Sequence, residues 1–155
     1  MAVHTDNAII IDAPLDLVWE SMNAVERWPE LFTEYASAEI LERNGDTVRF
    51  RLTTHPDPEH GGQVWTWVST RTADPSTYTT HSERIETGPF AFMHIDWSFA
   101  AMEGGTEMRW RQHFTMKPEV PFEDAEVQDN MNRNTRIQMQ VIKERIEAAA
   151  RAAAA

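Results

Sequence analysis

The segment at residues 65–71 carries the side chains that most strongly suggest chemistry. Read as a β-strand, it places on one face Trp65, Trp67, Ser69 and Arg71. A packing face would not include the arginine, because an unpartnered charge is costly to bury, and a solvent face would not include two tryptophans. The pattern predicts the wall of a cavity that holds an apolar ligand bearing oxygen atoms.

Several of these side chains also have a purely structural interpretation. The tryptophans could pack in the core, and Arg71 could reach water at the strand end. The next strand offers a second arginine, Arg84, which could instead form a surface ion pair with Glu86. Glu34 falls at the predicted cavity entrance, where solvation is the simpler interpretation.

A stripe of amides on the predicted C-terminal helix suggests the opposite wall. Asn130, Asn134 and Gln138 recur every four residues beside an apolar stripe. Each alone would be interpreted as solvated. Three in register predict a polar seam facing the cavity, because amides donate to and accept from ligand oxygens without adding charge.

Hydrophobic periodicity and turn residues predict the elements that position these side chains. A strand is expected at residues 3–12, followed by short helices at 14–22 and 25–31. Further strands are expected at 35–42, 47–54, 63–72, 77–87, 92–102 and 106–116, with a long helix from residue 122 to the C-terminus. This order predicts one α+β domain over residues 1–155, a helix-grip fold in which a curved antiparallel sheet wraps a long helix around an internal cavity.

Composition excludes several classes of function. The 155 residues suit one domain, and the absence of cysteine excludes disulfides and thiol chemistry. The net charge of −11 argues against nucleic-acid binding. We expect no signal peptide, no membrane span and a cytoplasmic location. The histidines show no metal-binding spacing and no glycine-rich loop opens a helix, so neither a metal nor a nucleotide cofactor is expected.

Motifs along nearly the whole chain resemble those of one enzyme family. The segments at residues 28–36, 64–69, 84–91 and 104–110, after an opening at 7–19, are similar to the monodomain aromatase/cyclases of bacterial type II polyketide synthases, of the tetracenomycin and spore-pigment kind. These belong to the START-like polyketide cyclase/dehydratase superfamily.

The resemblance implies a reaction and partners. Such enzymes take a linear poly-β-ketone from an acyl carrier protein, close a ring by aldol addition and dehydrate it to an aromatic product without a cofactor. The first ring usually closes between C9 and C14, and a second can follow. The partners would be the acyl carrier protein and other synthase subunits. Docking would need a basic patch, for which Arg43, Arg49 and Arg51 are candidates.

Roles follow from the chemistry of an aldol step, which needs a base and a group that stabilises the alkoxide. Arg71 is expected to stabilise the oxyanion, with a water held by Ser69 and with Tyr35 as an acid, base or orienting hydroxyl. Substrate contacts are expected from Trp28, Phe32, Glu34, Trp65, Trp67, Arg84, Met93, Trp97, Trp110, Gln112, Asn130, Asn134 and Gln138.

Two other functions remain open from the sequence. A START-like fold could bind an aromatic polyketide or lipid without turning it over, since fold does not decide function. A pure interaction domain would instead have a filled core, with a connected pocket below roughly a few hundred Å³.

Overall fold

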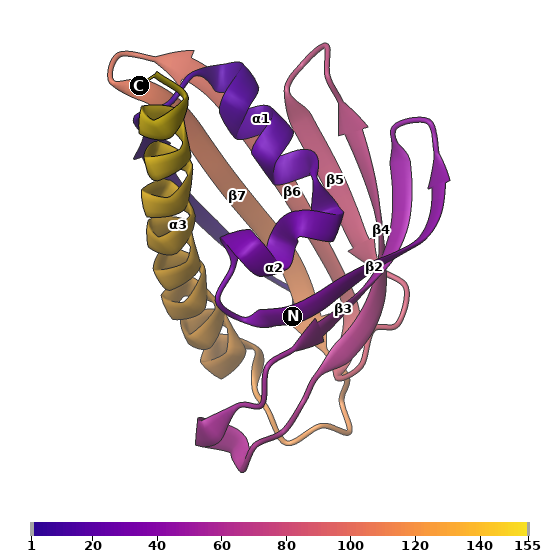
Figure 1. Ribbon diagram of the computed structural model, residues 1–155. Helices are drawn as coiled ribbons and strands as arrows, with labels where there is room; N and C mark the ends of the chain where they lie inside the picture. Colours follow the sequence, from indigo (N-terminus) through magenta and orange to yellow (C-terminus); the bar gives the residue numbers. More distant parts are fainter. Residues whose placement is uncertain (1, 155) are drawn as a thin grey trace.

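The computed structural model describes residues 2–154 (Figure 1). β1 (Val3–Ile11) is followed by α1 (Leu15–Asn23), the 3₁₀ turn η1 (Val25–Arg27) and α2 (Trp28–Leu31). Six strands follow, β2 (Tyr35–Asn44), β3 (Thr47–Thr54), β4 (Thr66–Asp74), β5 (Thr79–Arg84), β6 (Phe90–Met102) and β7 (Gly105–Met116), with the 3₁₀ turn η2 (Pro58–His60) between β3 and β4. The chain ends in α3 (Asp124–Ala154).

The seven strands form one antiparallel sheet in the order β1-β7-β6-β5-β4-β3-β2. The sheet curves, and α1, α2 and α3 lie on its concave side (Figure 1). The predicted arrangement of a long C-terminal helix held by a curved sheet is therefore confirmed. Within residues 2–154, no helix is both long and apolar enough to span a membrane.

The core lies between the concave face and the helices, because successive side chains of a strand point to opposite faces of the sheet and the inward ones are mostly apolar. In β6, Met93, Trp97 and Phe99 are buried, whereas the intervening Asp96 is exposed. The helix adds its own apolar stripe, with Met139, Ile142 and Ile146 buried against the sheet.

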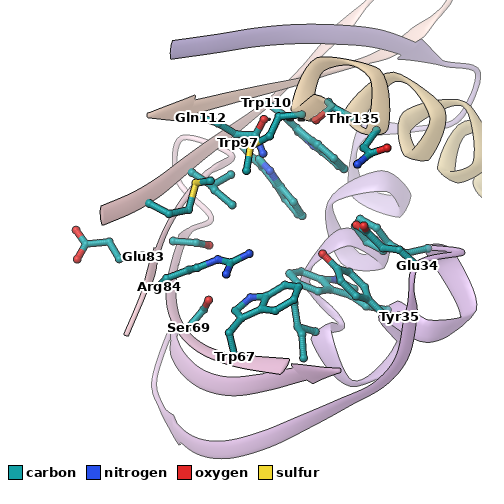
Figure 2. A pocket seen from close by; sticks show the side chains of 18 of the residues that line it. Glu34, Tyr35, Trp67, Ser69, Glu83, Arg84, Trp97, Trp110, Gln112 and Thr135 are labelled. Carbon is teal, nitrogen blue, oxygen red and sulfur yellow. Dashed lines mark hydrogen bonds between the residues drawn. The ribbon is translucent and has the colours of Figure 1, made fainter. Parts of the chain in front are cut away.

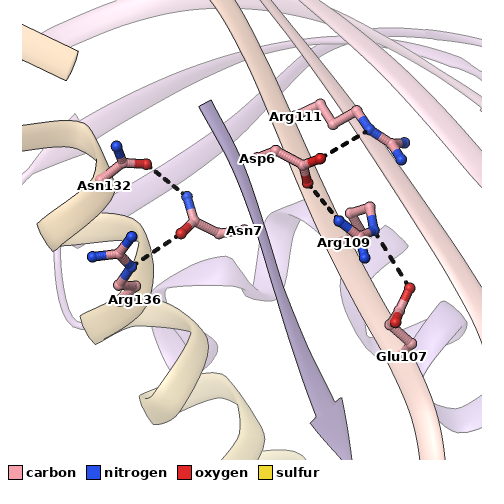
Figure 3. A network of polar contacts seen from close by, with 7 residues as sticks. All are labelled: Asp6, Asn7, Glu107, Arg109, Arg111, Asn132 and Arg136. Carbon is pink, nitrogen blue, oxygen red and sulfur yellow. Dashed lines mark hydrogen bonds and ion pairs between the residues drawn. The ribbon is translucent and has the colours of Figure 1, made fainter. Parts of the chain in front are cut away.

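Polar contacts fix α3 against β1 on the concave side of the sheet. Asn7 donates from Nδ2 to Oδ1 of Asn132 at 2.9 Å, and its Oδ1 accepts from Nε of Arg136 at 3.1 Å (Figure 3). The preceding residue Asp6 points the other way and pairs with Arg109 on β7. Alternation along one strand thus anchors the helix on one face and an ion-pair network on the other.

Several strand boundaries differ from those predicted by one to three residues, and the largest differences are the later start of β4 and the earlier end of β5 at Arg84. β4 begins at Thr66, because residues 61–65 follow the η2 turn and are exposed. β5 begins at Thr79, because Tyr78 has a φ of 54° and closes the β4–β5 turn in a left-handed conformation.

Candidate functional site

A cavity of about 170 Å³ lies between the concave face of the sheet, the α2–β2 connection and α3 (Figure 2). Most of its wall is aromatic or aliphatic, with a few polar groups among them. Its lining residues are Trp28, Phe32, Glu34, Tyr35, Phe50, Leu52, Trp67, Ser69, Ser82, Glu83, Arg84, Met93, Ile95, Trp97, Trp110, Gln112, Met131, Asn134 and Thr135.

One guanidinium group lies directly at the cavity. Arg84 ends β5 and faces Ser69 of β4 in the antiparallel register. Its guanidinium lies 4.1 Å from the ring centre of Trp67 and 4.9 Å from that of Phe90, and it points into the space in Figure 2. Burial lowers the pKa of Arg84 to about 10, so the side chain remains a cation at neutral pH. Cation–π contact with Trp67 holds it in place.

A carboxyl and a phenol lie across the cavity from Arg84. Glu34 lies just before β2 and Tyr35 is the first residue of that strand, so the carboxyl and the phenol are neighbours on the same side of the cavity. Burial raises the pKa of the Glu34 carboxyl, and burial with the neighbouring Glu34 charge raises that of Tyr35. A carboxylate with a raised pKa is a stronger base than a solvated one, so this pair can exchange protons with a ligand.

Arg71 lies deeper than the cavity. Its side chain is only 3% exposed and does not line the open space. It donates to Oδ1 of Asn23 at 2.5 Å and to the carbonyl of Met22 at 3.3 Å. Its guanidinium carbon lies 5.6 Å from the ring centre of Trp28 and 5.1 Å from that of Trp97, two residues of the cavity wall.

The charge of Arg71 is poorly compensated. Burial lowers its pKa to about 9, and within residues 2–154 it has no carboxylate partner. Its Nε atom is buried without any hydrogen-bond partner in the same residues. A buried cation held in this way costs stability and is typical of functional sites.

The indole wall also contains unused hydrogen-bond donors. Trp97 and Trp110 stack with ring centres 4.7 Å apart. In the described part of the chain, the Nε1 atoms of both are buried without a partner. An unsatisfied buried N–H group costs about 1–3 kcal/mol, so these two rings form part of the cavity wall at a cost in stability.

Comparison with known proteins now decides the family. Residues 11–144 match the model of the family described as polyketide cyclase / dehydrase and lipid transport. The chain belongs to this family. It is 54% identical over 147 residues, 95% of each chain, to a "putative polyketide cyclase" of Streptomyces cyaneus. It is 61% identical over 110 residues to a second protein of that name from Streptomyces halstedii, covering 71% of this chain and 99% of the relative.

A solved structure of the same shape supports the fold assignment. The Zhui aromatase/cyclase from Streptomyces sp. R1128 superposes with a TM-score of 0.79 at 19% identity, covering 97% of this chain and 94% of that one. The α+β START-like fold predicted for this family member is therefore confirmed.

Most of the predicted site residues line the cavity of this family member. The set includes Ser69 and Tyr35 of the proposed catalytic group and most of the proposed substrate contacts: Trp28, Phe32, Glu34, Trp67, Arg84, Met93, Trp97, Trp110, Gln112 and Asn134. Two surface interpretations were wrong. Glu34 lies within the cavity, and Arg84 lines it while Glu86 pairs with Arg51.

Four predicted site residues lie outside the cavity lining, among them Arg71 as described above. Trp65 precedes β4, is 37% exposed and packs edge-on against His60. Asn130 is exposed and accepts a hydrogen bond from Arg133. Gln138 is buried, but both ends of its amide bind Thr33. The predicted seam of three amides is thus reduced to Asn134 at the cavity.

Sequence reasoning missed several wall residues and the partner of Arg71. Ser82 shares the inward face of β5 with Arg84, and strand alternation could have identified it. Thr135 already belonged to the apolar helix stripe and was not read as lining. The other missed wall residues are Phe50, Leu52, Glu83, Ile95 and Met131. No sequence signal pointed to Asn23.

The suggested docking patch is neutralised. Each of the three arginines is within ion-pair distance of a glutamate: Arg43 with Glu26, Arg49 with Glu42, and Arg51 with Glu86. A free basic patch at these positions is therefore wrong.

Proposed function

We propose that this chain is an aromatase/cyclase that folds a carrier-bound linear poly-β-ketone and catalyses its regiospecific aldol cyclisation and dehydration. The single observation that carries the proposal is a cavity in which aromatic walls surround a cation, a phenol–carboxylate pair and unused indole donors. Family membership and relatives bearing the name polyketide cyclase support the same reaction.

The polar groups can divide the aldol step between them. A base removes a proton from a methylene carbon between two ketones, and the resulting carbanion attacks a second ketone. Glu34, with its raised pKa, is suited to be that base. Arg84 on the other side can stabilise the alkoxide as it forms, and Tyr35 can return the proton to it. Once its proton has passed through Tyr35 to the alkoxide, the ionised Glu34 can remove the remaining proton of the attacking carbon. This proton leaves with the new hydroxyl group as water, and enolisation of the ring ketones completes the aromatic ring.

We assign Arg71 a supporting electrostatic role beneath the wall. Its guanidinium lies against the outer faces of two rings that line the cavity, Trp28 and Trp97. A field from an uncompensated cation is strong in a medium of low dielectric constant, so it would favour an oxyanion on the cavity side. This differs from direct contact with the oxyanion, which falls to Arg84.

Cavity size limits how the substrate is held. At roughly 30 Å³ per water, a cavity of 170 Å³ has room for about six waters, or about one six-membered ring. We propose that only the ring-forming section enters and that the remaining chain extends toward the carrier protein. Closure of one ring first, between C9 and C14, fits this volume, and a second ring would form after the product shifts.

The same volume is also compatible with an interaction domain that binds no ligand. A connected space of 170 Å³ lies below the few hundred Å³ that marks a ligand pocket, and on size alone it favours an interaction domain with a filled core. A filled core has no need for a phenol beside a carboxyl group, or for two indole N–H groups that lack hydrogen-bond partners within the described residues. The lining therefore favours a ligand.

Reconstitution with a minimal type II polyketide synthase tests the proposal. Adding the protein should replace the spontaneous mixture of shunt products with one aromatic product, and Arg84→Ala should abolish this effect. Arg109→Ala is the matched control, because Arg109 is on the convex face and pairs with Asp6. An unchanged mixture would refute cyclase activity. Tight binding of an aromatic polyketide without any change in products would instead favour a carrier, as the lipid-transport part of the family description allows.

A further inference from the structure

Four polar side chains form a square on the convex face of the sheet, on the opposite side from the cavity. His81 and Glu83 lie two residues apart on β5, so both point outward. In the antiparallel register, His94 of β6 is directly opposite Glu83, and Asp96 is directly opposite His81. Directly opposite residues have Cβ atoms about 4.5–5.5 Å apart, so a two-by-two block of side chains can meet at one point.

The distances within this block suit a metal ion. Oε1 of Glu83 lies 2.9 Å from Nε2 of His81 and 3.8 Å from Nε2 of His94. One nitrogen or oxygen from each of His81, Glu83 and His94 falls within 4.8 Å of the others. In a tetrahedral zinc site with bonds of about 2.0–2.2 Å, ligand atoms are about 3.3–3.5 Å apart. Small rotations of half-exposed side chains would reach that spacing.

The fourth residue orients the first. Nδ1 of His81 lies 2.6 Å from Oδ1 of Asp96. A carboxylate at this nitrogen holds its proton and leaves Nε2, which faces Glu83, as the atom that can bind a metal. This carboxylate–histidine pairing is the usual outer-shell support of a metal-bound imidazole.

We propose that His81, Glu83 and His94 bind a divalent transition metal of the zinc class, with Asp96 as a positioning residue. Two imidazoles and one carboxylate suit zinc and its neighbours rather than calcium or magnesium, which prefer oxygen ligands alone. Three protein ligands leave a fourth position for water. His81 and Asp96 also border an open hollow lined by Ser98 and Arg111, which gives that position access to solvent.

A proton is the natural competitor for this position. A protonated His81 could bridge Glu83 and Asp96, and its hydrogen bond to Glu83, followed by that to Asp96, raises its pKa. Of the other charged or titratable groups nearby, His113 packs against His94 with ring centres 6.2 Å apart, and Arg111 pairs with Asp6. Because a metal needs neutral imidazoles, it would have to displace such a proton.

A metal here would also affect the cavity wall, because Glu83 belongs to the lining although its carboxylate points away from the open space (Figure 2). Glu83 immediately precedes Arg84, the last residue of β5. A metal shared by Glu83 and His94 would tie the end of β5 to β6 and so restrict the guanidinium on the other face. The site itself rests on convex-face geometry alone, and it stands or falls independently of the proposed cyclase activity.

The test measures zinc binding to the tag-free full chain. Equilibrium dialysis at pH 7.5 should give about one Zn²⁺ per chain, and the thermal midpoint should rise when zinc is added. His94→Ala and Glu83→Gln should each weaken binding by at least about tenfold, and Asp96→Asn by about 10–100-fold. At pH 5.5, binding by the unmodified chain should be largely lost.

His60→Ala is the matched control, because His60 pairs with Asp57 at 2.6 Å but has no second histidine in such a cluster within the described residues. It should bind zinc like the unmodified chain. Circular dichroism of each variant verifies folding, and Co²⁺ absorption gives a second measure of imidazole ligation. Stoichiometry far below one, or equal affinity in His94→Ala and Glu83→Gln, would overturn the proposal.

Discussion

Replacing Arg71 with methionine should leave the protein as stable as before or more stable, while removing aromatised product. Arg71 is 3% exposed, and no carboxylate balances its charge within residues 2–154. Methionine has a comparable length and is apolar, so it can fill the same space between Trp28 and Trp97 without burying a charge.

The magnitude follows from the pKa of Arg71. Its fall from the ordinary arginine value to about 9 corresponds to a penalty of about 5 kcal/mol for holding the cation in the folded protein. The hydrogen bond to Asn23 offsets about 2–3 kcal/mol and the 3.3 Å contact to Met22 adds little. Contact with two rings offsets about 1–2 kcal/mol more. A gain of about 0–2 kcal/mol remains for the methionine variant, or up to about 8 °C in midpoint.

The pH dependence has a definite sign. Because the folded pKa of Arg71 lies below the unfolded one, the unfolded chain binds more protons between about pH 9 and pH 12.5. The free energy of unfolding of the unmodified protein should therefore rise with pH in that window, relative to the Arg71→Met variant. Thermal melts of both proteins at pH 7.5, 9 and 10.5 should show that the midpoint of the unmodified chain rises relative to that of the variant as the pH increases.

Arg109→Met serves as the control in the same melts. Arg109 pairs with Asp6 on the convex face, which raises rather than lowers its pKa. The variant should show little change in midpoint and no comparable trend above pH 9. If Arg71→Met instead melts more than about 4 °C lower at pH 7.5, with no pH trend, Arg71 is a structural cation and the reasoning is wrong.

Three further predictions concern the hydrogen bonds between Gln138 and Thr33, the proposed base Glu34 and the turn at Gly105. Gln138→Ala should lower the midpoint by about 2–8 °C, because it removes both hydrogen bonds to Thr33, and should leave the products unchanged. An unchanged thermal midpoint would argue against a stabilising role for these hydrogen bonds. Cyclisation should slow as pH falls below the raised pKa of Glu34, because a base must be ionised, and Glu34→Gln should be slow at every pH. A variant with the original pH profile would exclude Glu34 as the base. Gly105→Ala should destabilise by roughly 3 kcal/mol or more in urea melts, because a Cβ there would lie 2.0 Å from the carbonyl oxygen of Ile11. Gly104→Ala, with nothing within 4 Å, should lose far less, and equal losses would contradict the steric cause.

Strand alternation is why the sheet was predictable. β6 alternates apolar and polar residues over 93–99 and β7 does so over most of its length, and inward residues of both, including Met93, Trp97 and Trp110, line the cavity as expected. The same parity correctly placed Trp67 and Ser69 on the inner face of β4. It failed at Trp65, where the strand had not yet begun.

Depth within the fold was not predictable in the same way. Strand alternation assigns Arg71 and Arg84 to the same inner face of the sheet, but it does not predict which of the two lines the cavity. That depends on how Trp28 and Trp97 pack over Arg71, a contact between residues far apart in the sequence. The amide stripe failed for a related reason. Helix spacing places Gln138 correctly, yet its partner Thr33 comes from a loop whose position no local pattern records.

Alternation also gives the two faces of β5 and β6 a physical connection. Ser82 and Arg84 face the cavity, whereas the side chains of the alternate residues His81 and Glu83 point outward. In a single sheet, adjacent residues share a peptide plane, so an outward side chain that is cross-linked to β6 restricts the inward side chain beside it. Arg84 is the most exposed to this effect because β5 ends there and only Glu83, not Arg84, pairs with β6. A metal bound by His81, Glu83 and His94 would therefore limit the movement of the Arg84 guanidinium, which Trp67 and Phe90 already contact.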